Sequence, residues 1–204
     1  MSVDGLLQDQ LDGECHPFCC LRDGVDMDIF EAISLNLSSE VRESIRAGAN
    51  LEASNSRGVE PIVAALDAAV RWREPTILQL LRGAGAKSAP LLQAIEGRLR
   101  LLPVTLLDEH NSTTQAINDT VDRLKGKESQ LADDERVRLK AFLTSSTAFD
   151  ATSQSLRDQL LTLSERVSRR DDTVLDAAVG YLIEVAGFQA DAMRLRMDSV
   201  TIAP

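Results

Sequence analysis

The residues with the most evident chemistry in this 204-residue chain lie in one short stretch near its N-terminus. The sequence CHPFCC holds Cys15, His16, Cys19 and Cys20, and these side chains are all of types that bind zinc in proteins. Six residues cannot readily supply four tetrahedral ligands, and no second Cys/His cluster in the sequence completes the site. We therefore interpret the stretch as a tail with free thiols. Zinc binding, reversible lipidation and a redox-active thiol are the alternatives.

The number and placement of the cysteines also indicate a compartment. The chain has three cysteines, an odd number, and all of them are crowded into this stretch. A secreted disulfide framework would spread an even number along the chain. The first 30 residues show neither a basic region nor an apolar segment of the kind that directs secretion. We expect an intracellular protein of a reducing compartment, the cytoplasm.

No other arrangement of residues predicts catalysis. His110 falls where we expect a helix to end, and a partial positive charge suits a helix C-terminus. The glycines of RGAGAK, 82–87, close an expected helix and do not open one after a strand, which excludes a phosphate-binding loop. The carboxylates of Asp133, Asp134 and Glu135 are typical of a helix N-terminus. We expect no enzyme activity, no catalytic residue and no cofactor.

A binding surface is predicted around the only tryptophan. Trp72 lies between Arg71 and Arg73, in what we expect to be an insertion between two helices. Trp and Arg are the residue types most enriched at binding hot spots. The alternative interpretation is that the indole packs against its own helices and the arginine side chains cover it.

Composition and charge limit the class of protein. Acidic residues number 32 and basic residues 22, which gives a net charge of −10 and disfavours nucleic-acid binding. Residues 1–31 hold eight acids against one arginine, a net charge of −7, which predicts an acidic N-terminal tail. Apolar residues make up 44% and aromatic residues 3%, which favours an aliphatic core built from helices. The longest nearly apolar stretch, 61–70, is too short to span a membrane.

Two-helix units recur between residues 27 and 111. Val41, Leu78 and Val104 can be aligned, and seven positions after each comes a residue that tolerates the left-handed backbone at the end of a helix. These residues are Gly48, Gly85 and Asn111. Each aligned segment follows another short helical pattern, at 27–36, 60–71 and 89–99, and prolines at 61, 75, 90 and 103 stand where helices are expected to begin. About three such units must stack to form a continuous core.

These units resemble ankyrin repeats. The segment GANLEASNSRG, 48–58, is similar to the finger that links two ankyrin repeats, and ILQLLRGAGA and VTLLDEHN are similar to the second helix of a repeat. None of the units carries the full T-P-L-H-x-A opening, and the aligned positions are 37 and 26 residues apart, where the family has about 33. The resemblance implies that the finger contributes to a concave binding face, through Asn50, Glu52, Asn55, Ser56 and Arg57.

After Asn111 the apolar residues follow a longer 3.5-residue period, typical of a helical bundle or coiled coil. Ser112 and Gln115 predict a capping box at the start of one helix, and further helices are expected from about residues 133 and 171. The short link at 169–172 favours an antiparallel hairpin between the last two helices. The seam of the last helix is expected to comprise Val174, Ala178, Tyr181, Val185, Phe188, Ala192 and Leu195. Ser146 and Ser153, in the seam of the preceding helix, either fix its register or face solvent.

Together these patterns predict an all-α protein. We expect an acidic tail or cap at 1–26, a short ankyrin-like array at 27–111, and a long antiparallel helical hairpin or three-helix bundle at 112–204. The predicted function is non-catalytic protein–protein interaction, as an adaptor, assembly subunit or inhibitor whose partner is another protein. The alternatives are a structural homo-oligomer, beginning with a homodimer, assembled through the C-terminal helices, and a zinc- or redox-responsive regulator that uses the cysteine cluster.

Overall fold

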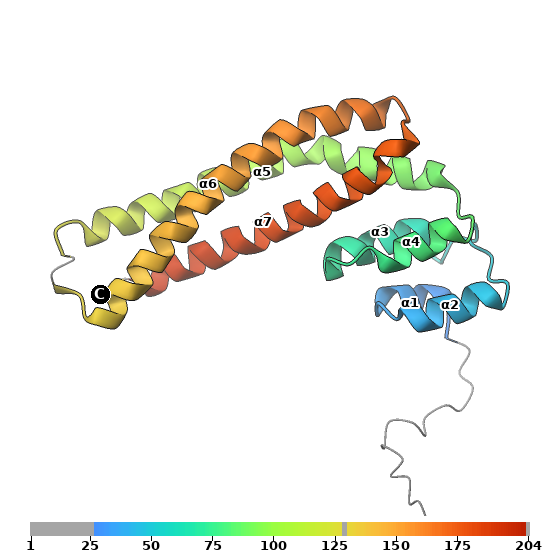
Figure 1. Ribbon diagram of the computed structural model, residues 1–204, viewed down its shortest axis with the longest axis horizontal. Helices are drawn as coiled ribbons and strands as arrows, with labels where there is room; N and C mark the ends of the chain where they lie inside the picture. Colours follow the sequence, from blue (N-terminus) through green and yellow to red (C-terminus); the bar gives the residue numbers. More distant parts are fainter. Residues whose placement is uncertain (1–26, 128–129, 203–204) are drawn as a thin grey trace, which may run out of the picture.

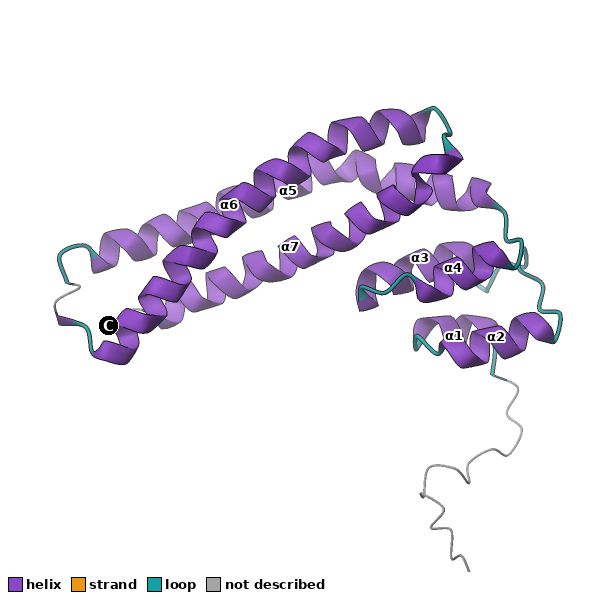
Figure 2. Ribbon diagram, viewed as in Figure 1, coloured by secondary structure: helices purple, strands orange, loops and turns teal. Residues whose placement is uncertain are grey.

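The computed structural model describes residues 27–127 and 130–202, and the regular structure of these residues is entirely helical (Figure 2). The predicted all-α fold class is therefore confirmed. Three long helices, α5 (Ser88–Leu124), α6 (Asp133–Ser168) and α7 (Leu175–Thr201), lie side by side, and four shorter helices gather beside the first half of α7 (Figure 1). None of the helices in these ranges is both long and apolar enough to cross a membrane.

The four shorter helices form two pairs that stack on one another. The first pair is α1 (Ile29–Ser34) and α2 (Ser38–Arg46), and the second is α3 (Pro61–Trp72) and α4 (Thr76–Gly83). Within the stack α1 contacts α3 and α2 contacts α4. Buried aliphatic side chains fill the space between them, including Ile33, Val41, Ile62, Leu66, Ile77 and Leu81.

The helices of these pairs begin and end at residues of the types expected from the sequence. Pro61 occupies the first turn of α3, where the N–H that proline lacks has no partner within the helix. Gly48 and Gly85 both have a positive φ, 84° and 94°, just beyond the ends of α2 and α4. A side chain with a Cβ would be strained in that conformation, so glycine is the residue that lets the chain turn there.

The third predicted unit is wrong, because α5 runs without a break from Ser88 to Leu124. Pro103 lies inside this helix, Asn111 does not close it, and Ser112 does not begin a new one. A proline in a helix interior removes one hydrogen bond and costs about 3 kcal/mol. Leu99 and Leu106 are buried on either side of it, and the packing of α5 against α6, α7 and α3 offsets that cost.

The three long helices contact one another along their lengths. The chain passes along α5, returns along α6 and runs forward again along α7 (Figure 1). The acidic residues at 133–135 lie in the first turn of α6, as predicted, and the Glu135 carboxylate accepts a hydrogen bond from the Ala132 N–H at 2.8 Å. Every residue of the seam predicted for α7 is buried. Ser146 and Ser153 are buried as well, so the alternative that they face solvent is wrong.

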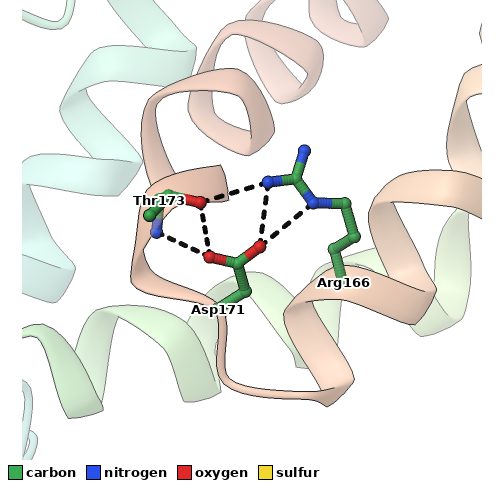
Figure 3. Close-up of polar contacts among 3 residues, drawn as sticks. All are labelled: Arg166, Asp171 and Thr173. Carbon is green, nitrogen blue, oxygen red and sulfur yellow. Dashed lines mark hydrogen bonds and ion pairs between the residues drawn. The ribbon is translucent and has the colours of Figure 1, made fainter.

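A small polar network forms the corner between α6 and α7, where a 3₁₀ turn (Asp172–Val174) precedes α7. The Asp171 carboxylate accepts hydrogen bonds from the Thr173 N–H at 3.0 Å and from Arg166 Nη2 at 2.8 Å (Figure 3). Hydrogen bonds from the Thr173 hydroxyl and from Arg166 lower the pKa of Asp171. The preceding residue, Arg170, has a φ of 56°, and this left-handed residue completes the reversal of the chain.

The paired helices and the long helices are in direct contact. Helix α3 packs against both α5 and α7. Ion pairs join Arg82 to Asp176 of α7 and Arg98 of α5 to Asp67 of α3. The first half of α7 therefore covers the side of α3 that an isolated two-pair stack would leave open.

Candidate functional site

A hollow of about 200 Å³ lies between α1, α3 and the loop that joins α2 to α3. We call it the arginine groove and define it by its lining residues. These are Phe30, Ile33, Ser34, Asn55, Arg57, Val59, Ala64, Asp67, Ala68 and Arg71. The apolar members supply a surface that can hold an apolar side chain, and the polar members lie around it.

The loop side of the groove is shaped by Asn55. Its side-chain oxygen accepts hydrogen bonds from the backbone N–H groups of Arg57, at 2.9 Å, and Val59, at 3.1 Å. Its own N–H donates to the Val59 carbonyl at 3.0 Å. An asparagine that bonds its own backbone in this way fixes a tight loop. Asn55 is thus a positioning residue that places Arg57 and Val59 at the groove.

The groove carries uncompensated positive charge. Arg57 and Arg71 are exposed and make no ion pair with any residue in the described ranges. The one acidic residue in the lining, Asp67, is paired with Arg98 of α5. Two guanidinium groups beside an apolar hollow form a site suited to carboxylates, because each can donate two parallel hydrogen bonds to one carboxylate.

Trp72 lies at the edge of the groove. It is the last residue of α3 and not part of an insertion, which corrects the sequence-based placement. The indole Nε1 donates to the Ser34 carbonyl at 3.3 Å, and the side chain remains 50% exposed. Arg73 turns away from the groove, since its Nη2 donates to the Ala186 carbonyl of α7 at 3.5 Å. Of the three adjacent predicted residues, only Arg71 lines the groove.

The remaining predicted finger residues do not line the groove. The Asn50 side chain accepts a hydrogen bond from the Glu52 N–H at 3.0 Å, and the Glu52 carboxylate pairs with Lys87 Nζ at 2.7 Å. These contacts tie the loop to the start of α5. Ser56 is exposed at the tip of the loop. The structure thus brings Asn55, Arg57 and Arg71 together and leaves Asn50, Glu52 and Ser56 apart from them.

Helix α1 supplies a wall of the groove that sequence reasoning did not identify. Phe30, Ile33 and Ser34 all lie in the pattern at 27–36 that predicts a helix. The periodicity of that pattern signals which residues are apolar. It does not show that the exposed edge of α1 lies opposite a loop more than 20 residues later in the chain.

His110 is the one of the two histidines that lies in the described part of the chain. His110 lies within α5 and not at a helix end, so the role expected for it is wrong. Its ring stacks on that of Phe149, with 6.2 Å between centroids, and its Nδ1 is 3.9 Å from an Asp150 carboxylate oxygen. Among residues 27–127 and 130–202, no group of three His, Cys, Asp or Glu is placed to hold a metal ion. Cys15, His16, Cys19 and Cys20 lie outside these ranges.

Comparison of the chain with protein-family models, with curated proteins and with solved structures finds no match.

Proposed function

We propose that this chain is a non-catalytic protein–protein interaction module that binds a partner through the arginine groove. It would act as an adaptor, assembly subunit or inhibitor, in the reducing, cytoplasmic compartment that the crowded cysteines favour. The observation that carries the proposal is the combination of two arginines that make no ion pair within the described ranges, an apolar hollow and the half-exposed Trp72 on one side of α1 and α3.

The stacking of the helix pairs supports an ankyrin-like reading of residues 27–86. First helices contact first helices, α1 with α3, and second helices contact second helices, α2 with α4. The loop from 47 to 60 then lies where the ankyrin resemblance implies a binding finger. In this reading α5 and α7 replace further repeats and cover the end of the array, and α5, α6 and α7 form a bundle within one chain.

The groove suits an extended segment that combines an apolar side chain with carboxylates. Burial of one large apolar side chain contributes about 1.5–3 kcal/mol. Each exposed arginine–carboxylate pair adds at most about 1 kcal/mol. Recognition by this groove is therefore specific in charge and modest in affinity, and the long helices provide a second surface for a more extensive contact.

Affinity capture from the native source tests the proposal. The baits are the full chain, the double variant Arg57→Gln/Arg71→Gln, and the control Arg42→Gln/Arg46→Gln, which removes two charges from α2 outside the groove. We expect a stoichiometric partner that the groove variant loses and the control retains. A partner that all three baits retain equally would reject the groove. A truncation at residue 112 is unsuitable because it cuts α5.

A homo-oligomer is the second candidate, and a specific feature of α7 favours it. Met193, Met197 and Val200 are exposed and, being spaced four and three residues apart, lie on one face of the last turns of this helix. An exposed apolar stripe of this kind is typical of a helix that packs against a partner. This candidate predicts a mass and a melting temperature that rise with protein concentration. A monomer whose melting temperature is independent of concentration would exclude it.

A further inference from the structure

The arginine groove lies next to the point where the described chain begins. Met27 packs against the hydrophobic core, and α1 starts two residues later. Phe30, Ile33 and Ser34 of this short helix line the groove. Any segment that precedes Met27 therefore joins the molecule one helical turn from the groove lining.

The residues that precede Met27 carry the negative charge that would complement the two arginines of the groove. Residues 1–26 contain six carboxylates and one arginine, a net charge of −5. Within them, Phe18 lies between Glu14 and Asp23, and Arg22, next to Asp23, leaves residues 14–23 with a net charge of −1. This order places one aromatic side chain between two carboxylates. It matches an apolar hollow flanked by Arg57 and Arg71, neither of which is paired within the described ranges.

We propose that residues 14–23 of this chain bind in the arginine groove and thereby compete with the partner protein. Phe18 enters the apolar part of the groove, and the flanking carboxylates lie beside Arg57 and Arg71. The competition rests on the proposed function, whereas the contact within the chain does not. The segment is thus a charge-dependent inhibitor of the surface to which it is tethered.

Tethering makes a weak contact sufficient. A short flexible linker gives a tethered segment an effective concentration of about 1 mM. A segment that would bind with a dissociation constant of about 1 mM as a free peptide therefore occupies the groove about half of the time. Since only the unoccupied fraction binds a partner, half occupancy weakens the apparent partner affinity about twofold.

The positions of the cysteines allow a direct test on the full chain. All three cysteines lie in this segment, so Cys19→Ser/Cys20→Ser leaves Cys15 as the single thiol for a nitroxide label. Paramagnetic broadening is then measured on the backbone amides of the folded residues and on the indole N–H of Trp72. We expect broadening concentrated on the groove, at Ser34, Val59 and Trp72, relative to the same sample with the nitroxide reduced.

The same label in Arg57→Gln/Arg71→Gln should lose this broadening, and in the control Arg42→Gln/Arg46→Gln it should keep it. Raising the salt concentration from 0.1 M to 1 M shortens the screening length from about 10 Å to about 3 Å and should also abolish the broadening. Both variants alter exposed side chains outside the core, and the Trp72 indole resonance reports whether the fold around the groove is intact.

Broadening that is spread evenly over the surface, or that survives in Arg57→Gln/Arg71→Gln, would overturn the proposal. This outcome is distinguishable from failure of the proposed function. If the groove captures a partner but shows no broadening, the contact within the chain is wrong and the interaction module stands. If the broadening is present and no bait captures a partner, the contact is correct and the proposed function is wrong.

Discussion

Raising the pH above 10 should destabilise this protein through one side chain, Tyr181. The residue is 2% exposed, on the face of α7 that packs against α6, and its hydroxyl donates to the Leu156 carbonyl at 2.9 Å. Burial, reinforced by the nearby negative charge of Glu184, raises the pKa of Tyr181 from 10.0 to about 12. Deprotonation in the folded state would place a charge inside the bundle.

The sign and size of the effect follow from the two pKa values. An unfolded tyrosine loses its proton near pH 10, and the folded one near pH 12. The contribution to stability is fully present below pH 10 and is lost as the pH rises from about 10 to about 12. At about 1.4 kcal/mol per pKa unit, the free energy of unfolding falls by at most about 2.7 kcal/mol over that window.

Two measurements check the reasoning. Tyr181 is the only tyrosine, so the ultraviolet absorbance of tyrosinate titrates it directly in the folded protein. Urea unfolding of the wild type and of Tyr181→Phe at a series of pH values then gives the contribution of Tyr181 to the free energy of unfolding. The titration of the lysines is common to both proteins and cancels in the difference. At neutral pH the variant should lose about 1 kcal/mol with the hydrogen bond, and the difference should vanish or reverse above pH 10. A folded-state midpoint near 10 would refute the packing of α7 on α6.

Three substitutions test other parts of the structure. If the indole is a hot spot, Trp72→Ala should weaken partner binding by at least about 2 kcal/mol, as measured by calorimetry. Circular dichroism should show an unchanged fold. Unaltered affinity would remove Trp72 from the site. Pro103→Ala should raise the free energy of unfolding by about 1–3 kcal/mol in urea, because alanine restores the helix interior, whereas a helix that began at residue 103 would gain nothing. Ser153→Ala should leave stability unchanged or raise it by about 1 kcal/mol, because the buried Ser153 hydroxyl has no hydrogen-bond partner in the described ranges. The matched change Ser146→Ala removes a hydrogen bond to the Phe142 carbonyl, and Ser153→Ala proving the more damaging of the two would contradict this reasoning.

Helix types and buried faces could be predicted from the sequence because they depend on local periodicity. The three- and four-residue spacing from Val174 to Leu195 identifies one face of α7, and burial of that face needs only some neighbouring helix. Gly48 and Gly85 could be predicted for a similar reason, since a left-handed backbone at a helix end selects glycine by local sterics.

The continuity of α5 could not be predicted, because it is decided by packing between distant residues. Pro103 followed by VTLLDEHN is as consistent with a new helix as with the middle of an old one. Residues on both sides of Pro103 are buried, and α5 packs against α6, α7 and α3, which favours continuation of the helix. The misplacement of His110 has the same origin, since a helix that does not end at Asn111 has no C-terminus there for the imidazole to occupy.

Only one of the two walls of the groove could be predicted from the sequence, because the two walls lie far apart in the chain. The loop wall has a local signal, since an asparagine that bonds the backbone two and four residues ahead is a recognisable turn. The α1 wall has none, because the groove exists only once α1 packs against α3. Phe30 is an apolar residue and is therefore expected in the core. Its position on α1 makes it part of the groove lining instead.

The packing of the long helices decides which arginines are available to a partner. Arg71 and Arg73 are equivalent in the sequence, two residues apart around Trp72. In the structure Arg73 reaches a carbonyl of α7, and Arg82 and Arg98 pair with carboxylates across the junction between the helix pairs and the bundle. Arg71 lines the groove and stays exposed, whereas Asp67, one turn earlier on α3, is paired with Arg98 of α5. One set of arginines thus joins the helix pairs to the bundle, while Arg57 and Arg71 remain exposed beside the hollow, where we propose the recognition site.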